Sequence, residues 1–529
     1  MKKFSIILLI IFSLLIISSC HGKKDDGTKK KIASDYEVPQ EFDETKNYKI
    51  LFWSKNDSNS TQKDIYLRAI DEFEAIYPNI EIEMVTYYDY PSIYKDALIN
   101  IGTNTPPDVC ITYPDHVASY KEGQDIIVPL EKFYNDDKYG LGGSEIKFSS
   151  AGKNGVVEKF LNECYFAGHL YAIPFVRSSE ACYVNVDLLK ELGFEVPEIL
   201  TWDFVWEVCK KARVLHPYTN FNPLMYKSTD NMAIQMARQY NIPYSNENGE
   251  IYLFNDQMAN LLSELMDYAS AKDPRNRLFE TFKRKSYPGN FYNKGRCVFA
   301  IDSTAGSTWL GTTAPLLDID KKEVANFETK VMIVPQHDIT NPQMISQGPS
   351  LCIFNNNDSG KVLASWLFVQ YLLTKDIQMS YAKTEGYIPV TRDALYSDEY
   401  QDYLNHEDDG TAEYYKVKLD ASKLVIDNID NTFVTPVFNG SSLLRAGAGD
   451  LIEGLFDTSY SGETDKEKME KINQLFYDVK ALNRLEITSN KMPAISIVVL
   501  VLIGVSWLSL GGIMIYTLYQ KRKKKFVSK

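Results

Sequence analysis

Aromatic residues, polar residues or both follow at several points where a short apolar run of the sequence ends. Their rings offer flat apolar faces, while carboxylate, guanidinium and hydroxyl groups offer directional hydrogen bonds. Together such side chains could hold a polar organic molecule without reacting with it. The residues of this kind are Trp53, Tyr113 with Asp115, Phe175 with Arg177, and Asp302 with Ser303.

Sequence patterns that carry catalysis are missing. The chain contains no HExxH or GxSxG motif, no phosphate-binding loop, and no GxGxxG between a predicted strand and helix. The histidines at positions 116, 169, 216, 337 and 406 show no metal-ligand spacing. We therefore expect no catalytic residue, no metal and no cofactor.

Composition and charge describe a folded, acidic protein. The 529 residues are 44% hydrophobic and 24% charged, which is ordinary for a globular chain. Residues 21–492 carry 49 basic and 70 acidic side chains, a net charge of −21. A phosphate backbone would repel such a surface, so the sequence argues against nucleic-acid binding.

The N-terminal segment has the features of an export signal. Two lysines precede the uncharged apolar run 4–17, which is too short to span a membrane as a helix but suits a signal peptide. The residues Ile17-Ser18-Ser19-Cys20 resemble the bacterial lipobox, so we expect residues 1–20 to be a lipoprotein signal and Cys20 to be acylated. Residues 21–46 are polar and predict a flexible tether.

The C-terminal segment predicts a second membrane anchor. Residues 494–516 are uncharged and mostly apolar, long enough for a transmembrane helix, and lysines and arginine follow at 521–525. The positive-inside rule places the basic tail, residues 517–529, in the cytoplasm and the acidic domain outside the cell membrane.

Six cysteines remain besides Cys20. Four of them, at positions 110, 182, 297 and 352, lie inside apolar, strand-like runs, and none has a metal-ligand spacing. We expect buried free thiols, although export permits disulfides whose pairing the sequence does not assign.

The folded part opens with alternating strands and helices. Strand-like segments at 48–52, 80–85 and 108–112 alternate with helical patterns at 61–77 and 91–101. This order is typical of a parallel sheet with crossover helices. A second series contains strands at 181–184, 296–301 and 348–354, with a helix after Thr201 as its N-cap.

Six motifs in order resemble the extracellular solute-binding proteins of bacterial ABC importers, specifically the carbohydrate-binding family that includes maltose-binding proteins. The resemblance covers about residues 47–485. The first motif is the opening strand Tyr48-Lys49-Ile50-Leu51-Phe52 that ends at Trp53, and the most specific is the stretch Tyr183-Val184-Asn185-Val186-Asp187-Leu188-Leu189 followed by Gly193-Phe194, Pro197 and Thr201-Trp202. The other four are Pro106-Pro107-Asp108-Val109, Tyr171-Ala172-Ile173-Pro174-Phe175, Phe291-Tyr292-Asn293-Lys294-Gly295-Arg296, and Gly386-Tyr387-Ile388-Pro389-Val390.

The resemblance implies an α/β, two-lobed fold of the periplasmic-binding-protein type, with hinge crossings between the lobes, to which the sequence adds one C-terminal transmembrane helix. We expect an N-terminal lobe from residues 47–173 and 296–345. The C-terminal lobe is expected from residues 174–295 and 346–485.

The resemblance also places a ligand in the cleft between the lobes, where open α/β sheets bind ligands at the carboxyl ends of their strands. A sugar would stack on aromatic rings and bond to carboxylate, amide and hydroxyl groups. Besides the residues named above, the expected ligand-binding set includes Asp89, Tyr226, Trp309 and Gln347. Tryptophans 202, 206 and 366 are expected to pack in the core.

The resemblance implies that the protein captures a carbohydrate of oligosaccharide size by hinge closure. It would then deliver this ligand to an ABC permease whose ATPase is a separate subunit. The protein is expected to be a monomer. Two alternatives remain open at this point: an ectodomain that senses a ligand and signals to a membrane partner, and a surface protein that binds or cleaves polysaccharide.

Overall fold

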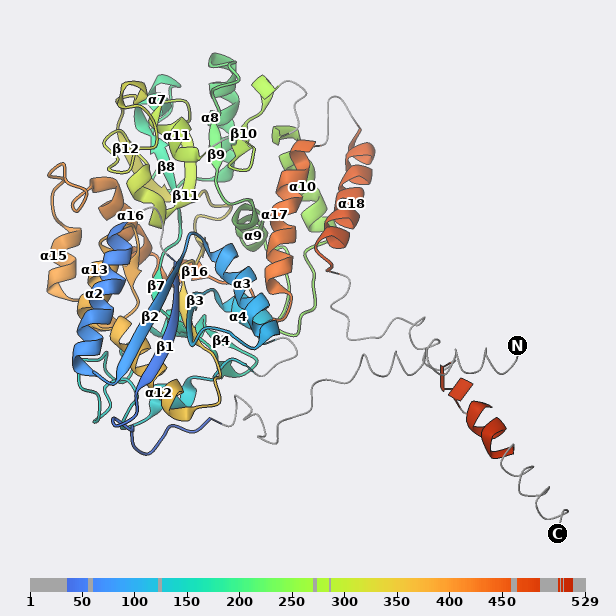
Figure 1. The fold of residues 1–529 in the computed structure, drawn as a ribbon. Coiled ribbons are helices and arrows are strands. Elements are labelled where there is room, and N and C mark those ends of the chain that lie inside the picture. Colours follow the sequence, from blue (N-terminus) through green and yellow to red (C-terminus); the bar gives the residue numbers. More distant parts are fainter. Residues whose placement is uncertain are drawn as a thin grey trace, which may run out of the picture.

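A computed structural model describes residues 36–55, 60–121, 126–269, 274–284, 287–457 and 464–485, together with 503–504, 506–507 and 509–516. The chain forms two α/β lobes, each built on its own five-stranded sheet (Figure 1). The lobe with β1 to β3 occupies the lower part of the view, and the lobe with β8 to β12 the upper part.

The first lobe contains the strand order β2-β1-β3-β14-β6, in which β1 runs parallel to β2 and β3, while β14 is antiparallel to both β3 and β6. Its strands are β1 Tyr48–Lys55, β2 Ile80–Tyr87, β3 Val109–Thr112, β6 Ile173–Pro174 and β14 Ser350–Ile353. Its helices are α2 Ser60–Ile76, α3 Tyr90–Thr103, α4 Pro114–Tyr120, α5 Glu131–Asn135, α6 Glu158–Asn162, α12 Ser359–Leu372, α13 Lys375–Ala382, α14 Arg392–Leu395 and α15 Asp398–Leu404.

The second lobe repeats this arrangement with the order β10-β9-β11-β8-β12, in which β9 to β11 are parallel and β8 is antiparallel to both of its neighbours. Its strands are β8 Glu180–Asn185, β9 Leu224–Tyr226, β10 Phe279–Thr281, β11 Phe299–Ser303 and β12 Thr329–Ile333. Its helices are α7 Val186–Glu191, α8 Trp202–Leu215, α9 Thr229–Gln239, α10 Asp256–Ala269, α11 Pro288–Asn293, α17 Ser441–Asp457 and α18 Asp465–Leu482.

Local sequence explains where several of these elements begin. The Asp89 carboxylate accepts a hydrogen bond from the backbone N–H of Ser92 and caps α3, and Pro91 occupies the first turn, where no backbone donor is needed. The Thr201 hydroxyl caps α8 in the same way by accepting from the Phe204 N–H. The predicted cap of α8 is therefore confirmed.

The predicted core tryptophans are also confirmed. Trp202 and Trp206 are buried and stack with ring centroids 5.6 Å apart on α8. Trp366 is fully buried on α12 and donates its indole N–H to the Tyr139 carbonyl at 2.9 Å. The six cysteines of the described chain are all buried and free, as expected.

Within the described residues, the chain crosses between the lobes three times. The first crossing runs through β7 Val176–Arg177, which pairs with β15 Ile388–Pro389, and the second runs back through residues 345–349. The third lies near β16 Thr432–Phe433, which pairs with β13 Met344–Ile345 and leads to α17. Helix α16 Lys416–Asp427 packs on both lobes near this joint.

The predicted lobe boundaries need correction. Strands β11 and β12 pair in the second sheet, so residues 296–345 belong to the second lobe and not to the first. Strand β14 pairs with β3, so residues 346–427 largely return to the first lobe, whereas 441–485 belong to the second. A strand's hydrophobic pattern does not specify which sheet it joins, because that depends on partners distant in sequence.

Within the described residues, no helix has the length and apolar character needed to cross a bilayer. Only residues 503–504, 506–507 and 509–516 of the segment predicted to span are described. The signal peptide and Cys20, most of the tether, and the basic tail lie outside the described residues.

Candidate ligand-binding cleft

The carboxyl ends of strands from both lobes meet at a cavity of about 750 Å³. In the first lobe, Lys55 is the last residue of β1, and Tyr113 directly follows β3. In the second lobe, Lys227 and Phe282 directly follow β9 and β10, and Ser303 ends β11. This is the location at which open α/β sheets bind ligands.

Aromatic side chains line both walls of this cleft. The first lobe contributes Tyr88, Tyr90, Tyr113 and Tyr387, and the second contributes Phe282, Tyr287 and Trp309. The rings of Tyr90 and Tyr113 lie 4.7 Å apart, and those of Phe282 and Tyr287 stack at 4.4 Å. Two facing sets of rings can hold a ligand with apolar faces between them.

Charged side chains lie among the rings. The carboxylates are Asp89 and Glu385 from the first lobe, and Glu180, Asp302 and Asp318 from the second. The lysines are Lys55 and Lys227. The Lys227 ammonium lies 2.7 Å from the buried Asp302 carboxylate, and that ion pair opposes the effect of burial, which raises the Asp302 pKa.

Glu180 is the most deeply buried of these carboxyl groups. Its two oxygens accept hydrogen bonds from the Tyr226 hydroxyl at 2.7 Å and from the Asn231 amide at 3.0 Å. Burial raises its pKa to about 8, although both hydrogen bonds act in the opposite direction. At neutral pH the group is therefore mostly protonated and can offer a proton as well as lone pairs.

Six residues of the predicted ligand-binding set line the cleft. They are Asp89, Tyr113, Asp302, Ser303, Trp309 and Gln347. They come from both lobes and from the second crossing, so the structure brings together residues separated by more than 250 positions.

The other five predicted residues do not line the cleft, and we correct their expected role. Trp53 is only 5% exposed and packs against Tyr87 inside the first sheet, where β1 lies between β2 and β3 and continues past Trp53 to Lys55. Phe175 is fully buried between Tyr66 and Tyr381.

Arg177 is a structural residue. Its guanidinium is buried, forms an ion pair with Glu163 at 2.7 Å, and donates to the Pro349 carbonyl at 3.0 Å. It thereby joins the first and second crossings. Tyr226 is also fully buried and contributes only through its hydrogen bond to Glu180.

Asp115 lies beside the cleft where the lobes touch. Its backbone carbonyl accepts a hydrogen bond from the Ser442 hydroxyl of α17 at 3.1 Å. Arg445, one turn further along α17, forms an ion pair with Asp230 at 2.7 Å and is close enough to Asp115 for the opposite charges to interact. This cluster links α4 of the first lobe to the second lobe.

Sequence reasoning missed several cleft residues, notably Glu180, Lys227, Tyr287 and Glu385. Lys227 could have been found from the expectation that ligands bind at the carboxyl ends of strands, since it directly follows β9. However, β9 has only three residues, which is too short for its hydrophobic pattern to predict a strand. Glu385 directly precedes the Gly386–Val390 motif and Tyr387 lies in it, but that motif indicated only the family resemblance and not the cleft.

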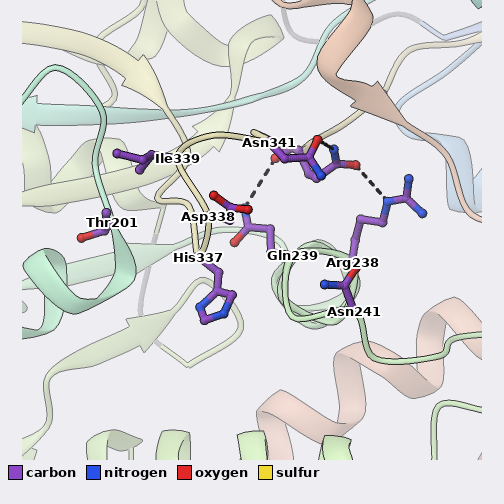
Figure 2. A pocket seen from close by; sticks show the side chains of 9 residues that line it. Thr201, Arg238, Gln239, Asn241, His337, Asp338, Ile339 and Asn341 are labelled. Carbon is purple, nitrogen blue, oxygen red and sulfur yellow. Dashed lines mark hydrogen bonds between the residues drawn. The ribbon is translucent and has the colours of Figure 1, made fainter.

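A second cavity of about 580 Å³ lies on the second lobe, between the end of α9 and the loop 337–343 (Figure 2). Its nine lining residues include no aromatic ring other than the His337 imidazole, which stacks on Tyr240. Arg238 donates to the Gln343 side chain at 2.9 Å, and Gln239 accepts from the Trp202 indole at 2.8 Å. These side chains bond to one another and to the loop, so the cleft between the lobes is the candidate ligand site that we take further.

Fold and cleft together define a two-lobed α/β binding protein. The family model described as bacterial extracellular solute-binding protein matches residues 68–407, and the chain belongs to this family. It is 23% identical over 283 residues to the arabinooligosaccharide-binding protein of Bacillus subtilis, a match that spans 51% of this chain and only 56% of that relative.

Solved structures show the same fold. The cyclic α-maltosyl-1,6-maltose binding protein of Arthrobacter globiformis superposes with a TM-score of 0.59 at 14% identity, covering 82% of this chain and 99% of that one. UgpB of Mycobacterium tuberculosis, solved with glycerophosphocholine, superposes with a TM-score of 0.60 at 15% identity, covering 82% and 98%.

Proposed function

We propose that this protein captures a carbohydrate, of oligosaccharide size, between its lobes and delivers it to an ABC permease driven by a separate ATPase. The observation that carries the proposal is the cleft with aromatic rings on both walls and carboxyl, amide and hydroxyl groups between them. A cavity of about 750 Å³ suits a small organic ligand. The relative named for arabino-oligosaccharides supports the same ligand class.

The mechanism follows from the position of the cleft. A ligand that touches Tyr90 and Tyr113 on one lobe and Tyr287 and Trp309 on the other gains all of these contacts only when the lobes are together. Such a ligand binds the closed state more tightly and shifts the population towards it. The chain itself acts as a binding protein and performs no reaction in this scheme.

The experiment is a thermal unfolding screen of the full-length protein against arabinotriose, maltotriose, cellotriose and xylotriose. A ligand that binds only the native state raises its stability by about 2.7 kcal/mol at a concentration of 100 times Kd. We expect at least one trisaccharide to raise Tm, and the Trp309→Ala variant to lose most of that increase.

The matched control is Tyr218→Ala, because Tyr218 is 60% exposed on the second lobe and does not line the cleft. This variant should keep the full response. A protein that responds to no saccharide, or a Trp309→Ala variant that responds like the wild type, would contradict the proposal.

We also propose that the protein is held at the outer face of a cell membrane by acylated Cys20 and by the apolar segment 494–516. The lipobox-like residues 17–20 and the uncharged run support this arrangement. Membrane fractionation of the wild type, of Cys20→Ser and of a chain ending at residue 492 would test each anchor. If both anchors hold the protein, each single variant stays with the membranes and only a variant that lacks both is released. Release of a single variant would contradict the anchor that it keeps, and a wild type found in the soluble fraction contradicts both.

A further inference from the structure

Negative charge predominates in the cleft. Five carboxyl groups and two lysines line it, and within the described part of the chain no arginine does. The Lys227 ammonium is paired with Asp302 at 2.7 Å, and Lys55 lies over the Tyr90 ring at 5.1 Å. Neither lysine therefore presents its charge to a ligand without first leaving a partner.

The carboxyl groups surround the cavity, since Asp89 and Glu385 belong to one lobe and Glu180, Asp302 and Asp318 to the other. A ligand group between the lobes would face carboxyl oxygens on both sides. Glu180 is mostly protonated at neutral pH, and the remaining groups still outnumber the lysines. An anion placed there would meet like charge in a partly buried site, where screening by salt is weak.

The aromatic rings of the cleft also favour a cationic ligand over an anionic one. The faces of Tyr and Trp rings carry partial negative charge and attract cations. Tyr88 and Tyr90 flank Asp89 in the sequence, Tyr387 lies two positions after Glu385, and all of these residues line the same cavity. An ammonium group could contact a carboxylate and a ring together.

The Tyr90 hydroxyl provides a second, independent indication of a ligand. The side chain lines the cleft and is only 9% exposed, and its hydroxyl has no hydrogen-bond partner in the part of the chain that the structure describes. A buried polar group without a partner is costly. A ligand hydroxyl or ammonium group would supply the missing hydrogen bond.

We propose that the cleft selects saccharides that are uncharged or carry a protonated amine, and that it rejects saccharides and polyols bearing carboxylate or phosphate. The inference rests on the proposed function and adds the charge class of the ligand. Like charges brought together in a binding site are strongly disfavoured, so we expect an anionic ligand to bind on the order of 100 times more weakly than a neutral one.

The test compares three groups of probes by thermal unfolding and calorimetry of the full-length protein. The neutral group contains arabinotriose, maltotriose, cellotriose and xylotriose. The amine group contains glucosamine oligomers, and the anionic group contains galacturonic acid oligomers and glycerol 3-phosphate.

Binding within the neutral or amine group, with anionic probes at least 100 times weaker, is the expected result. An anionic probe that binds as tightly as the best neutral or amine probe overturns the charge inference and leaves saccharide capture intact. If no saccharide binds, the proposed function is overturned, and the charge inference is overturned with it.

A charge-reversal variant tests whether the charge of the cleft causes this selectivity. Asp318 is an exposed cleft residue of the second lobe, so Asp318→Lys should weaken binding of an amine-bearing or neutral probe by no more than about tenfold and strengthen binding of galacturonic acid oligomers. Glu198→Lys makes the same change of net charge at an exposed position outside the cleft and should alter neither. Equal effects of both variants would mean that overall charge, and not the cleft, sets the selectivity.

Discussion

At the scale of single residues, two tryptophans near strand ends have opposite roles. Trp309 lies in the cleft, whereas Trp53 is buried in the first sheet beside Tyr87. Trp53→Ala should lower the free energy of unfolding by about 3–5 kcal/mol, because it leaves a large cavity. Trp309→Ala should change this free energy by much less while weakening ligand binding.

Urea denaturation of both variants, together with ligand titration, separates these roles. A Trp53→Ala protein that is as stable as the wild type but binds ligand poorly would restore Trp53 to the binding site and contradict its placement in the core.

Glu180 gives the stability of the protein a dependence on pH. Its pKa rises from 4.5 in the unfolded chain to about 8 in the fold, so between these values the folded state holds a proton that the unfolded state has released. Stability from this group is therefore complete below pH 4.5 and falls as pH rises to about 8. The slope approaches about 1.4 kcal/mol per pH unit.

The Glu180→Gln variant keeps a similar shape and hydrogen-bonding capacity towards Tyr226 and Asn231, and it cannot ionise. From pH 5 to pH 8 the wild type should lose stability relative to the Glu180→Gln variant, so the free energy of unfolding of the variant minus that of the wild type should increase. Taking the difference cancels the titration of other groups. A constant difference across this range would mean that the Glu180 pKa is not raised.

At the scale of elements, the crossings depend on a buried ion pair and a glycine. Arg177 in β7 joins Glu163 to the backbone of the second crossing at Pro349. Arg177→Met would leave the Glu163 carboxylate buried without its partner, which costs about 3–5 kcal/mol. Adding Glu163→Gln should recover part of this loss.

Chemical denaturation of the two single variants and the double variant measures the coupling between Arg177 and Glu163. Additive losses, with no coupling, would show that the two side chains do not act as a pair in solution.

Gly348 lies in the second crossing with φ near +120°, and a Cβ atom there would lie 2.3 Å from the Val176 carbonyl oxygen. Gly348→Ala should therefore destabilise the protein by more than about 1 kcal/mol. Gly168→Ala is the matched control: φ there is also positive, +80°, but no atom lies within 4 Å of the added Cβ. If the two variants lose equal stability in urea, backbone strain alone, and not the contact with Val176, explains the effect.

At the scale of the whole molecule, the contact between α4 and α17 links the lobes beside the cleft. The Ser442 hydroxyl bonds to the Asp115 carbonyl, and Arg445 interacts with both Asp230 and Asp115. We expect Arg445→Gln to weaken every ligand by a similar factor, because it disfavours the closed state without touching the ligand.

The measurement is Kd for two different ligands, with small-angle scattering of the ligand-free protein. Lys468→Gln removes an ion pair with Asp267 that lies entirely within the second lobe, so it should change neither Kd nor the scattering. A loss confined to one ligand would mean that Arg445 contacts that ligand directly.

The family resemblance and the local elements followed from the sequence. The strands at 48–55 and 80–87, the helix between them, and the Thr201 cap depend on hydrophobic period and on capping chemistry, which neighbouring residues decide. The expectation that ligands bind at the carboxyl ends of strands, applied to the predicted strands at 108–112 and 296–301, also found Tyr113, Asp302 and Ser303 in the cleft.

Only the tertiary structure decided which sheet each later strand joins and which strand-end residues face the cavity. Residues 299–303 and 350–353 have similar sequence patterns, both typical of short apolar strands. Nevertheless, the first segment pairs with β8 in the second lobe and the other pairs with β3 in the first lobe. Trp53 and Arg177 satisfied the same local rule as Tyr113, but packing against distant residues buried them. Pairing and burial depend on contacts between segments far apart in the chain, and a local pattern does not contain that information.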